Sequence, residues 1–177
     1  TRVYNRERLN VRRIFFMFKH LSKILIFALV VGLTCLGAIA PVGALSYNNQ
    51  TLEDRDFSGQ DLRDSSFDHT NLRNANFSHA QLQGVRFFSA NLEGANFEGA
   101  DLRYSDLESA RLTKTNFTDA NLEGAFLTNI LVKGAIFDGA DLTDVVIRPD
   151  TEKILCTMLT GTNSLTKRNT RDTLYCP

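Results

Sequence analysis

The chain has 177 residues, of which 23% are charged and 43% apolar, and its formal net charge is zero. This composition is that of an ordinary folded soluble protein. This net charge of zero is the sum of two parts of the chain with opposite charge. Residues 1–44 hold seven Lys and Arg against one Glu (7 − 1 = +6), and residues 45–177 hold thirteen against nineteen (13 − 19 = −6). The two parts therefore belong to different functional units, and the acidic second part, which shows no basic patch in the sequence, disfavours direct binding to nucleic acid.

Residues 1–44 have the three parts of an export signal: a basic stretch, an apolar run at 24–40, and small residues before a cleavage site. We expect cleavage after Ala44, because cleavage after Ala40 would leave Pro41 in the next position. The alternative is an uncleaved membrane segment, since the 17 residues of the run are just enough to span a bilayer. Arg12 and Arg13 leave the export route, Sec or twin-arginine, open.

Cysteine usage points to an oxidising compartment. Of the three cysteines, Cys35 lies in the leading segment, which leaves Cys156 and Cys176 as an even pair in the rest of the chain. The pair predicts one disulfide, of the kind found in exported proteins.

A five-residue repeat runs without insertion from 50 to 149. All twenty central positions are apolar, and two residues before each the side chain is usually Ala, Ser or Thr. The centres are Leu52, Phe57, Leu62, Phe67, Leu72, Phe77, Leu82, Phe87, Leu92, Phe97, Leu102, Leu107, Leu112, Phe117, Leu122, Leu127, Val132, Phe137, Leu142 and Ile147. A period of five fits neither one face of a helix nor one face of a single strand.

The pattern Ala-(Asn/Asp)-(Leu/Phe)-x-x, as in residues 90–94 and 120–124, resembles the pentapeptide-repeat family over 100 residues. The resemblance implies an all-β solenoid: a right-handed quadrilateral β-helix of about five coils, with one pentapeptide per side and four per coil. Residues 20 apart would then stack. We expect two internal ladders, one of Phe57, Phe77, Phe97, Phe117 and Phe137, and one of Leu52, Leu72, Leu92, Leu112 and Val132.

The period stops after Pro149, and residues 150–177 are expected to cap the β-helix of residues 45–149. Residues 150–159 read as a short helix with Asp150 as N-cap and Gly161 just past its end. Ile154, Leu155, Met158 and Leu159 would supply its apolar face. A disulfide between Cys156 and Cys176 would staple this cap.

The tail also resembles that of pentapeptide proteins from the thylakoid lumen of cyanobacteria and chloroplasts. The matching residues are Leu155-Cys156, Gly161-Thr162-Asn163, 170–174 and Cys176. This narrower resemblance implies a lumenal protein, with the periplasm as the alternative location. We expect Arg168 and Arg171 to bond helix-end carbonyls rather than a ligand.

Catalysis has little support in the sequence. His69 and His79 are ten residues apart, which would place them on opposite sides of the β-helix. The Asn, Asp, Ser or Thr before each centre is explained by turn and backbone hydrogen bonding. We find no phosphate loop, nucleophile elbow or metal-ligand cluster, and therefore expect no enzyme, no cofactor and no metal.

Large apolar residues at outward positions are the exceptions to the pattern. Phe88, Tyr104 and Phe126 are our candidates for a protein-docking surface, with Phe88, Phe126 and Val146 sharing one side. For Leu131, Ile136 and Val146 the expectation is burial under the C-terminal cap.

The leading functional hypothesis is a non-catalytic exported scaffold or protein-binding module whose partner is a protein, such as a membrane complex. It would touch the membrane only through the N-terminal segment, if that segment is uncleaved. The alternative is an acidic DNA mimic that acts on DNA gyrase, as some pentapeptide-repeat proteins do. The charge of −6 permits this, but export of the chain argues against a cytosolic target.

Overall fold

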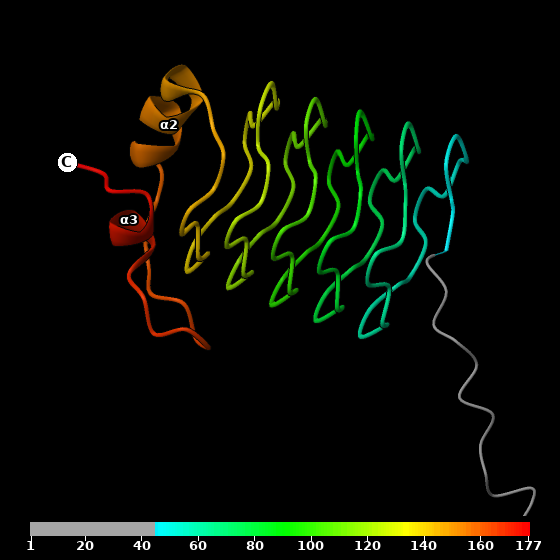
Figure 1. Ribbon diagram of the computed structural model, residues 1–177, viewed down its shortest axis with the longest axis horizontal. Helices are drawn as coiled ribbons and strands as arrows, with labels where there is room; N and C mark the ends of the chain where they lie inside the picture. The colour runs from blue at the N-terminus through cyan, green and yellow to red at the C-terminus, as the bar shows by residue number, and fades with distance from the viewer. Residues whose placement is uncertain (1–44) are drawn as a thin grey trace, which may run out of the picture. The chain divides into compact units, whose positions relative to one another are not determined.

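The computed structural model describes residues 45–177, so the predicted export signal and Cys35 lie outside the described residues. Parallel backbone bridges join each residue before a centre to the residue 20 positions later, from Ser46–Ser66 to Phe126–Val146. Each coil of the solenoid therefore takes twenty residues, and the coils stack side by side along one axis (Figure 1).

The bridges form four columns, one for each side of the solenoid, and we name the sides after them. Side A carries Thr51, Asn71, Asn91, Arg111 and Leu131; side B carries Asp56, Asn76, Asn96, Asn116 and Ile136; side C carries Asp61, Gln81, Asp101, Asn121 and Asp141; side D carries Ser46, Ser66, Arg86, Asp106, Phe126 and Val146.

The core lies inside the solenoid and consists of the central residues and the small residues two positions before them. The predicted phenylalanine ladder from Phe57 to Phe137 is confirmed, with ring centroids of successive coils 4.9 to 5.2 Å apart and nearly parallel. The predicted leucine ladder is also inside: Leu72, Leu92 and Leu112 are fully buried. A second aromatic stack, Tyr47–Phe67–Phe87, runs inside side D.

Each side ends in a β-turn that makes the corner. At the corner after Leu72, the Leu72 carbonyl accepts a hydrogen bond from the Ala75 amide at 3.1 Å, and Asn74 has a φ of 54°. A positive φ at the third residue is the mark of a type II turn and favours Gly, Asn and Asp there. This requirement explains why the last residue of each pentapeptide is so often one of these.

The residue before each centre stabilises the turn that follows. Asn76 accepts a hydrogen bond from the Ser78 amide at 3.1 Å, and its own amide group donates to Asp56 one coil earlier. Asn116 repeats both bonds, to the Thr118 amide and to Asn96. Backbone and ladder bonding therefore accounts for these polar residues without acid–base chemistry.

Two helices form the C-terminal cap: α2 (Pro149–Cys156) and the four-residue α3 (Thr170–Thr173). The predicted N-cap at Asp150 is wrong. Arg148 is the N-cap of α2, and Pro149 begins the helix because its fixed φ suits the first helical residue, where no amide donor is needed. Asp150 instead lies in the first turn, where it pairs with Arg148. Within residues 45–177, no helix is long and apolar enough to cross a membrane.

The cap covers the open end of the solenoid with fewer residues than predicted. Leu155 in α2 and Leu159, three residues beyond its end, are buried in the core cluster, and Met158 packs partly against it. Ile154, which the sequence places on the same face, is 51% exposed. The predicted helix over 150–159 is too long, because α2 stops at Cys156 and leaves Met158 and Leu159 beyond its end.

Candidate protein-docking surface

A buried asparagine joins the cap to the solenoid. The Asn163 side chain, fully buried, donates hydrogen bonds to the carbonyls of Gly139 at 2.8 Å and Asp119 at 3.1 Å. Its oxygen accepts from the amides of Leu165 and Thr166. These two corner carbonyls lie on successive coils and accept no backbone hydrogen bond from a neighbouring coil of the described chain, so Asn163 ties the cap to the last two coils.

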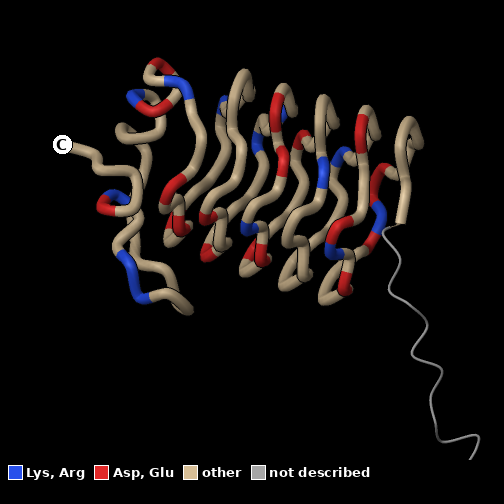
Figure 2. Tube along the Cα trace, viewed as in Figure 1, with Lys and Arg blue, Asp and Glu red and all other residues tan. Residues whose placement is uncertain are grey.

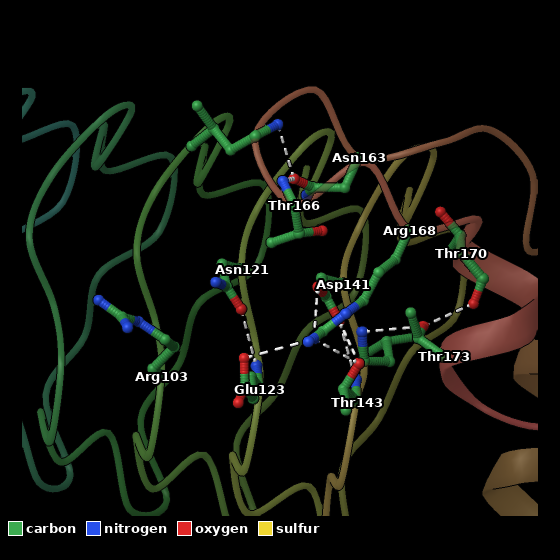
Figure 3. A network of polar contacts seen from close by, with 12 residues as sticks. Arg103, Asn121, Glu123, Asp141, Thr143, Asn163, Thr166, Arg168, Thr170 and Thr173 are labelled. Atoms are coloured by element: carbon green, nitrogen blue, oxygen red, sulfur yellow. Dashed lines mark hydrogen bonds and ion pairs between the residues drawn. The ribbon is translucent and has the colours of Figure 1, made fainter.

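A buried carboxylate on side C forms the second link. Asp141 is fully buried and accepts from the Thr143 hydroxyl at 2.6 Å and from Arg168 at 3.2 Å, while Arg168 also reaches Glu123 at 3.4 Å (Figure 3). Burial by itself raises the pKa of Asp141, but the hydrogen bonds from Thr143 and the charge of Arg168 outweigh burial and hold that pKa below its usual value.

The expectation for the two cap arginines holds for one of them. Arg171 donates to the carbonyl of Cys156, the last residue of α2, at 2.6 Å. Arg168 bonds carboxylates instead of helix-end carbonyls. The sequence contains no spacing signal for this pairing, because residues 141 and 168 meet only when the cap folds back on side C.

The structure joins Cys156 and Cys176 by a disulfide, with Cα atoms 5.5 Å apart. The bond closes a loop with a sequence separation of 20 that contains Asn163 and Arg168. The loop that carries both polar links to the solenoid is therefore fixed at its two ends.

The three candidate docking residues do not form one surface. Phe88 is partly buried, with its ring edge against His69 at a centroid distance of 5.5 Å. Tyr104 is 62% exposed and Phe126 47% exposed. Phe126 is a bridge residue of side D, whereas Phe88 occupies the turn between sides D and A and Tyr104 the turn between sides C and D.

Tyr104 and Phe126 belong instead to a group that we call the apolar corner, made of Tyr104, Phe126 and Val146. Phe126 and Val146 are bridge partners on side D, and Tyr104 lies two residues before Asp106, the other bridge partner of Phe126. Tyr104 has a φ of 58°, and its ring lies against Gly124, where an added Cβ would come within 2.7 Å. A bulky residue is thus held in a backbone conformation that glycine adopts at no cost.

The predicted burial of Leu131, Ile136 and Val146 under the cap is wrong. They are 58%, 51% and 45% exposed, respectively. All three occupy the place before a centre, whose side chain points away from the core, and the cap covers the end of the solenoid rather than sides A, B and D.

No site in the described residues resembles an active site. Among residues 45–177 no cluster of three His, Cys, Asp or Glu could hold a metal ion. An open hollow of about 430 Å³ between side C and the cap is lined by polar residues, among them Lys167, Arg168 and Tyr175. The Arg168 guanidinium in this hollow is already paired with Asp141.

Comparison with known proteins gives the family. The family described as "Pentapeptide repeats" matches in eight copies, over residues 56–87, 80–119, 90–129 and 115–148. Among solved structures, a pentapeptide repeat protein from the Arabidopsis thaliana thylakoid lumen is 48% identical over 72% of this chain and 88% of its own, with a TM-score of 0.71. A pentapeptide repeat protein from Nostoc is 26% identical over 60% and 87%, with a TM-score of 0.51.

No curated protein has significant similarity to the chain. The matched repeats extend over more than half of the sequence, and the neighbouring structures have the same right-handed quadrilateral β-helix. The chain therefore belongs to the pentapeptide-repeat family.

Proposed function

We propose that this protein is a non-catalytic binding module of the thylakoid lumen that docks another protein on its apolar corner. The observation that carries the proposal is Tyr104, which is 62% exposed at a turn position with positive φ and flanked along its column by Gly84 and Gly124. Exposing an aromatic ring in a strained turn is costly to the free protein, and a partner that buries the ring would recover the apolar contact.

The apolar corner has the chemistry of a docking surface. Tyr104, Phe126 and Val146 are each at least 45% exposed, and they lie on adjacent coils. Tyrosine and phenylalanine are enriched at protein interfaces. The stacked coils beneath hold the side chains on a rigid backbone, which lowers the entropy lost on binding. Phe88 lies against His69 and contributes less.

The similarity of 48% to a thylakoid-lumen protein supports the lumenal compartment, and an oxidised Cys156–Cys176 pair suits an exported protein. The periplasm is the alternative. An intact mass of the native protein, taken after alkylation of free thiols, tests this point. We expect a chain that starts at Leu45 and is unalkylated. An unprocessed, alkylated chain in the cytosol would contradict the compartment.

Mimicry of DNA toward gyrase is the less favoured function. A DNA mimic needs an evenly acidic surface, whereas basic residues occur among the acidic ones on several coils (Figure 2). On side A, the segments 110–114 and 130–134 carry Arg111, Lys114 and Lys133 and no carboxylate.

The docking proposal is tested with two single substitutions, Tyr104→Asp and Phe126→Asp, and a matched control, Asn129→Asp, at an exposed turn of side D. Each variant replaces the wild-type protein in its host, and the size of its native complexes is measured by native gel. We expect the first two variants to fold and to lose their complexes, because a charge at the centre of an interface is desolvated without a partner. Unchanged complexes in both variants would refute the apolar corner.

A further inference from the structure

A second exposed group lies on side A, across the solenoid from side C. It consists of Arg111, Lys114, Leu131 and Lys133, and we call it the basic patch. Arg111 and Leu131 are bridge partners on successive coils, and the Lys114 amide donates to the Lys133 carbonyl at 3.0 Å. All four side chains are exposed, Leu131 by 58%. The patch therefore places three cations and one apolar side chain on two adjacent coils.

Lys114 occupies the same kind of position as Tyr104. Its φ is 59°, and the turn positions one coil earlier and one coil later are Gly94 and Gly134. A Cβ added to Gly134 would meet the Lys114 side chain at 3.7 Å, so the lysine stem passes over that glycine toward the coil that carries Leu131. The positive φ of Lys114 and the glycine beside it let the lysine stem lie against the coil that carries Leu131 and Lys133.

The two segments that form the patch contain three cations and no carboxylate. None of the three cations takes part in an ion pair within residues 45–177, and segments 110–114 and 130–134 contain no Asp or Glu. The acidic composition of residues 45–177 predicts no basic patch, and this cluster corrects that prediction, because residues far apart in the sequence gather on adjacent coils. Three neighbouring like charges repel one another, and an anionic partner would relieve this repulsion.

We propose that the basic patch is a second docking surface, which binds an acidic segment of a partner protein and covers Leu131 with an apolar side chain of that segment. Charge complementarity favours an acidic partner. A protein segment is favoured over a nucleic acid, because three cations are few for a polyanion and a nucleic acid would leave Leu131 uncovered. The patch lies on side A, and the apolar corner lies on side D and its border with side C, so the two surfaces have no residue in common.

The test is a fluorescence anisotropy titration of the full chain with a labelled peptide in which glutamates alternate with leucines. We compare wild type with Lys133→Glu, Leu131→Ser and, as matched control, Arg73→Glu, an exposed arginine in the same column of side A, three coils before Lys133. We expect each patch variant to bind about tenfold more weakly and the control to bind within about twofold of wild type. Added salt should weaken wild-type binding.

Several outcomes would overturn the proposal. If Leu131→Ser and Lys133→Glu bound the peptide as tightly as wild type, the basic patch would not be the binding site. If Arg73→Glu weakened binding as much as the patch variants do, the peptide would be held by general charge attraction and not at a defined site. Binding to phosphatidylglycerol vesicles but not to the peptide would assign the patch to a membrane. Self-association lost in Leu131→Ser would assign it to a second copy. Phe126→Asp should leave peptide binding unchanged, so this titration tests the basic patch independently of the docking proposed for the apolar corner.

Discussion

Replacing Asn163 by Asp tests how the cap holds the last coil. The substitution keeps the size of the side chain and the two bonds that its oxygen accepts from Leu165 and Thr166. It removes the amide donor that bonds the carbonyls of Gly139 at 2.8 Å and Asp119 at 3.1 Å. Each buried acceptor that loses its donor costs about 1–3 kcal/mol, and a carboxylate facing carbonyls adds to this. We expect a loss of about 2–5 kcal/mol in the free energy of unfolding.

Urea unfolding followed by circular dichroism measures the loss, and hydrogen exchange of residues 135–149 shows whether the last coil opens first. Asn169→Asp is the matched control, because Asn169 is an exposed N-cap of α3 that only accepts a bond from Arg171, and aspartate caps as well as asparagine. If Asn163→Asp unfolds at the same urea concentration as the control, the reasoning about the cap is refuted.

Three further predictions concern the cap and the corners. Breaking the Cys156–Cys176 disulfide with reductant should lower the free energy of unfolding by about 3 kcal/mol, since its sequence separation is 20; urea unfolding with and without reductant measures this. Gly124→Ala should destabilise by more than about 1 kcal/mol, because its φ is +68° and the new Cβ would stand 2.7 Å from the Tyr104 ring; thermal unfolding measures this. The pKa of Asp141 is lower in the folded chain than its ordinary value, so its stabilisation is complete above about pH 4 and is lost as pH falls through the folded pKa; unfolding from pH 7 to 2 measures this.

Each of these has its own control. Gly59→Ala shares the positive φ of +63° but meets nothing within 4 Å, so it should cost less than Gly124→Ala; equal costs would show that the tyrosine ring moves freely. Asp141→Asn should have a weaker acid dependence than wild type, and an identical pH profile in the two proteins would assign the acid sensitivity to other groups. Reductant should leave a Cys156→Ser, Cys176→Ser double variant unchanged.

The period of five predicts most of the fold. Twenty apolar centres in phase allow one arrangement in which every centre points inward, and the stacked phenylalanines from Phe57 to Phe137 follow from this register. The corner turns are equally local, because Gly, Asn and Asp at the last place of the pentapeptide are residues that accept a positive φ.

The cap is harder to predict because its contacts are not periodic. Pro149, rather than Asp150, sets the start of α2, and the end of the solenoid has room for Leu155 and Leu159 but not Ile154. The sequence does not indicate that Asn163 bonds the corner carbonyls of two successive coils. That role depends on a loop returning to residues more than 20 positions away.

Which side chains face outward follows from the sequence alone, since alternation within each short side fixes their direction. Which of them lie together depends on the folded coils. Stacking by 20 residues places Phe126 beside Val146 and Arg111 beside Leu131, while Phe88 turns against His69 and leaves the surface that Phe126 helps to form. The surface neighbours of a residue come from adjacent coils and from the cap, and the size and charge of those side chains decide the contact.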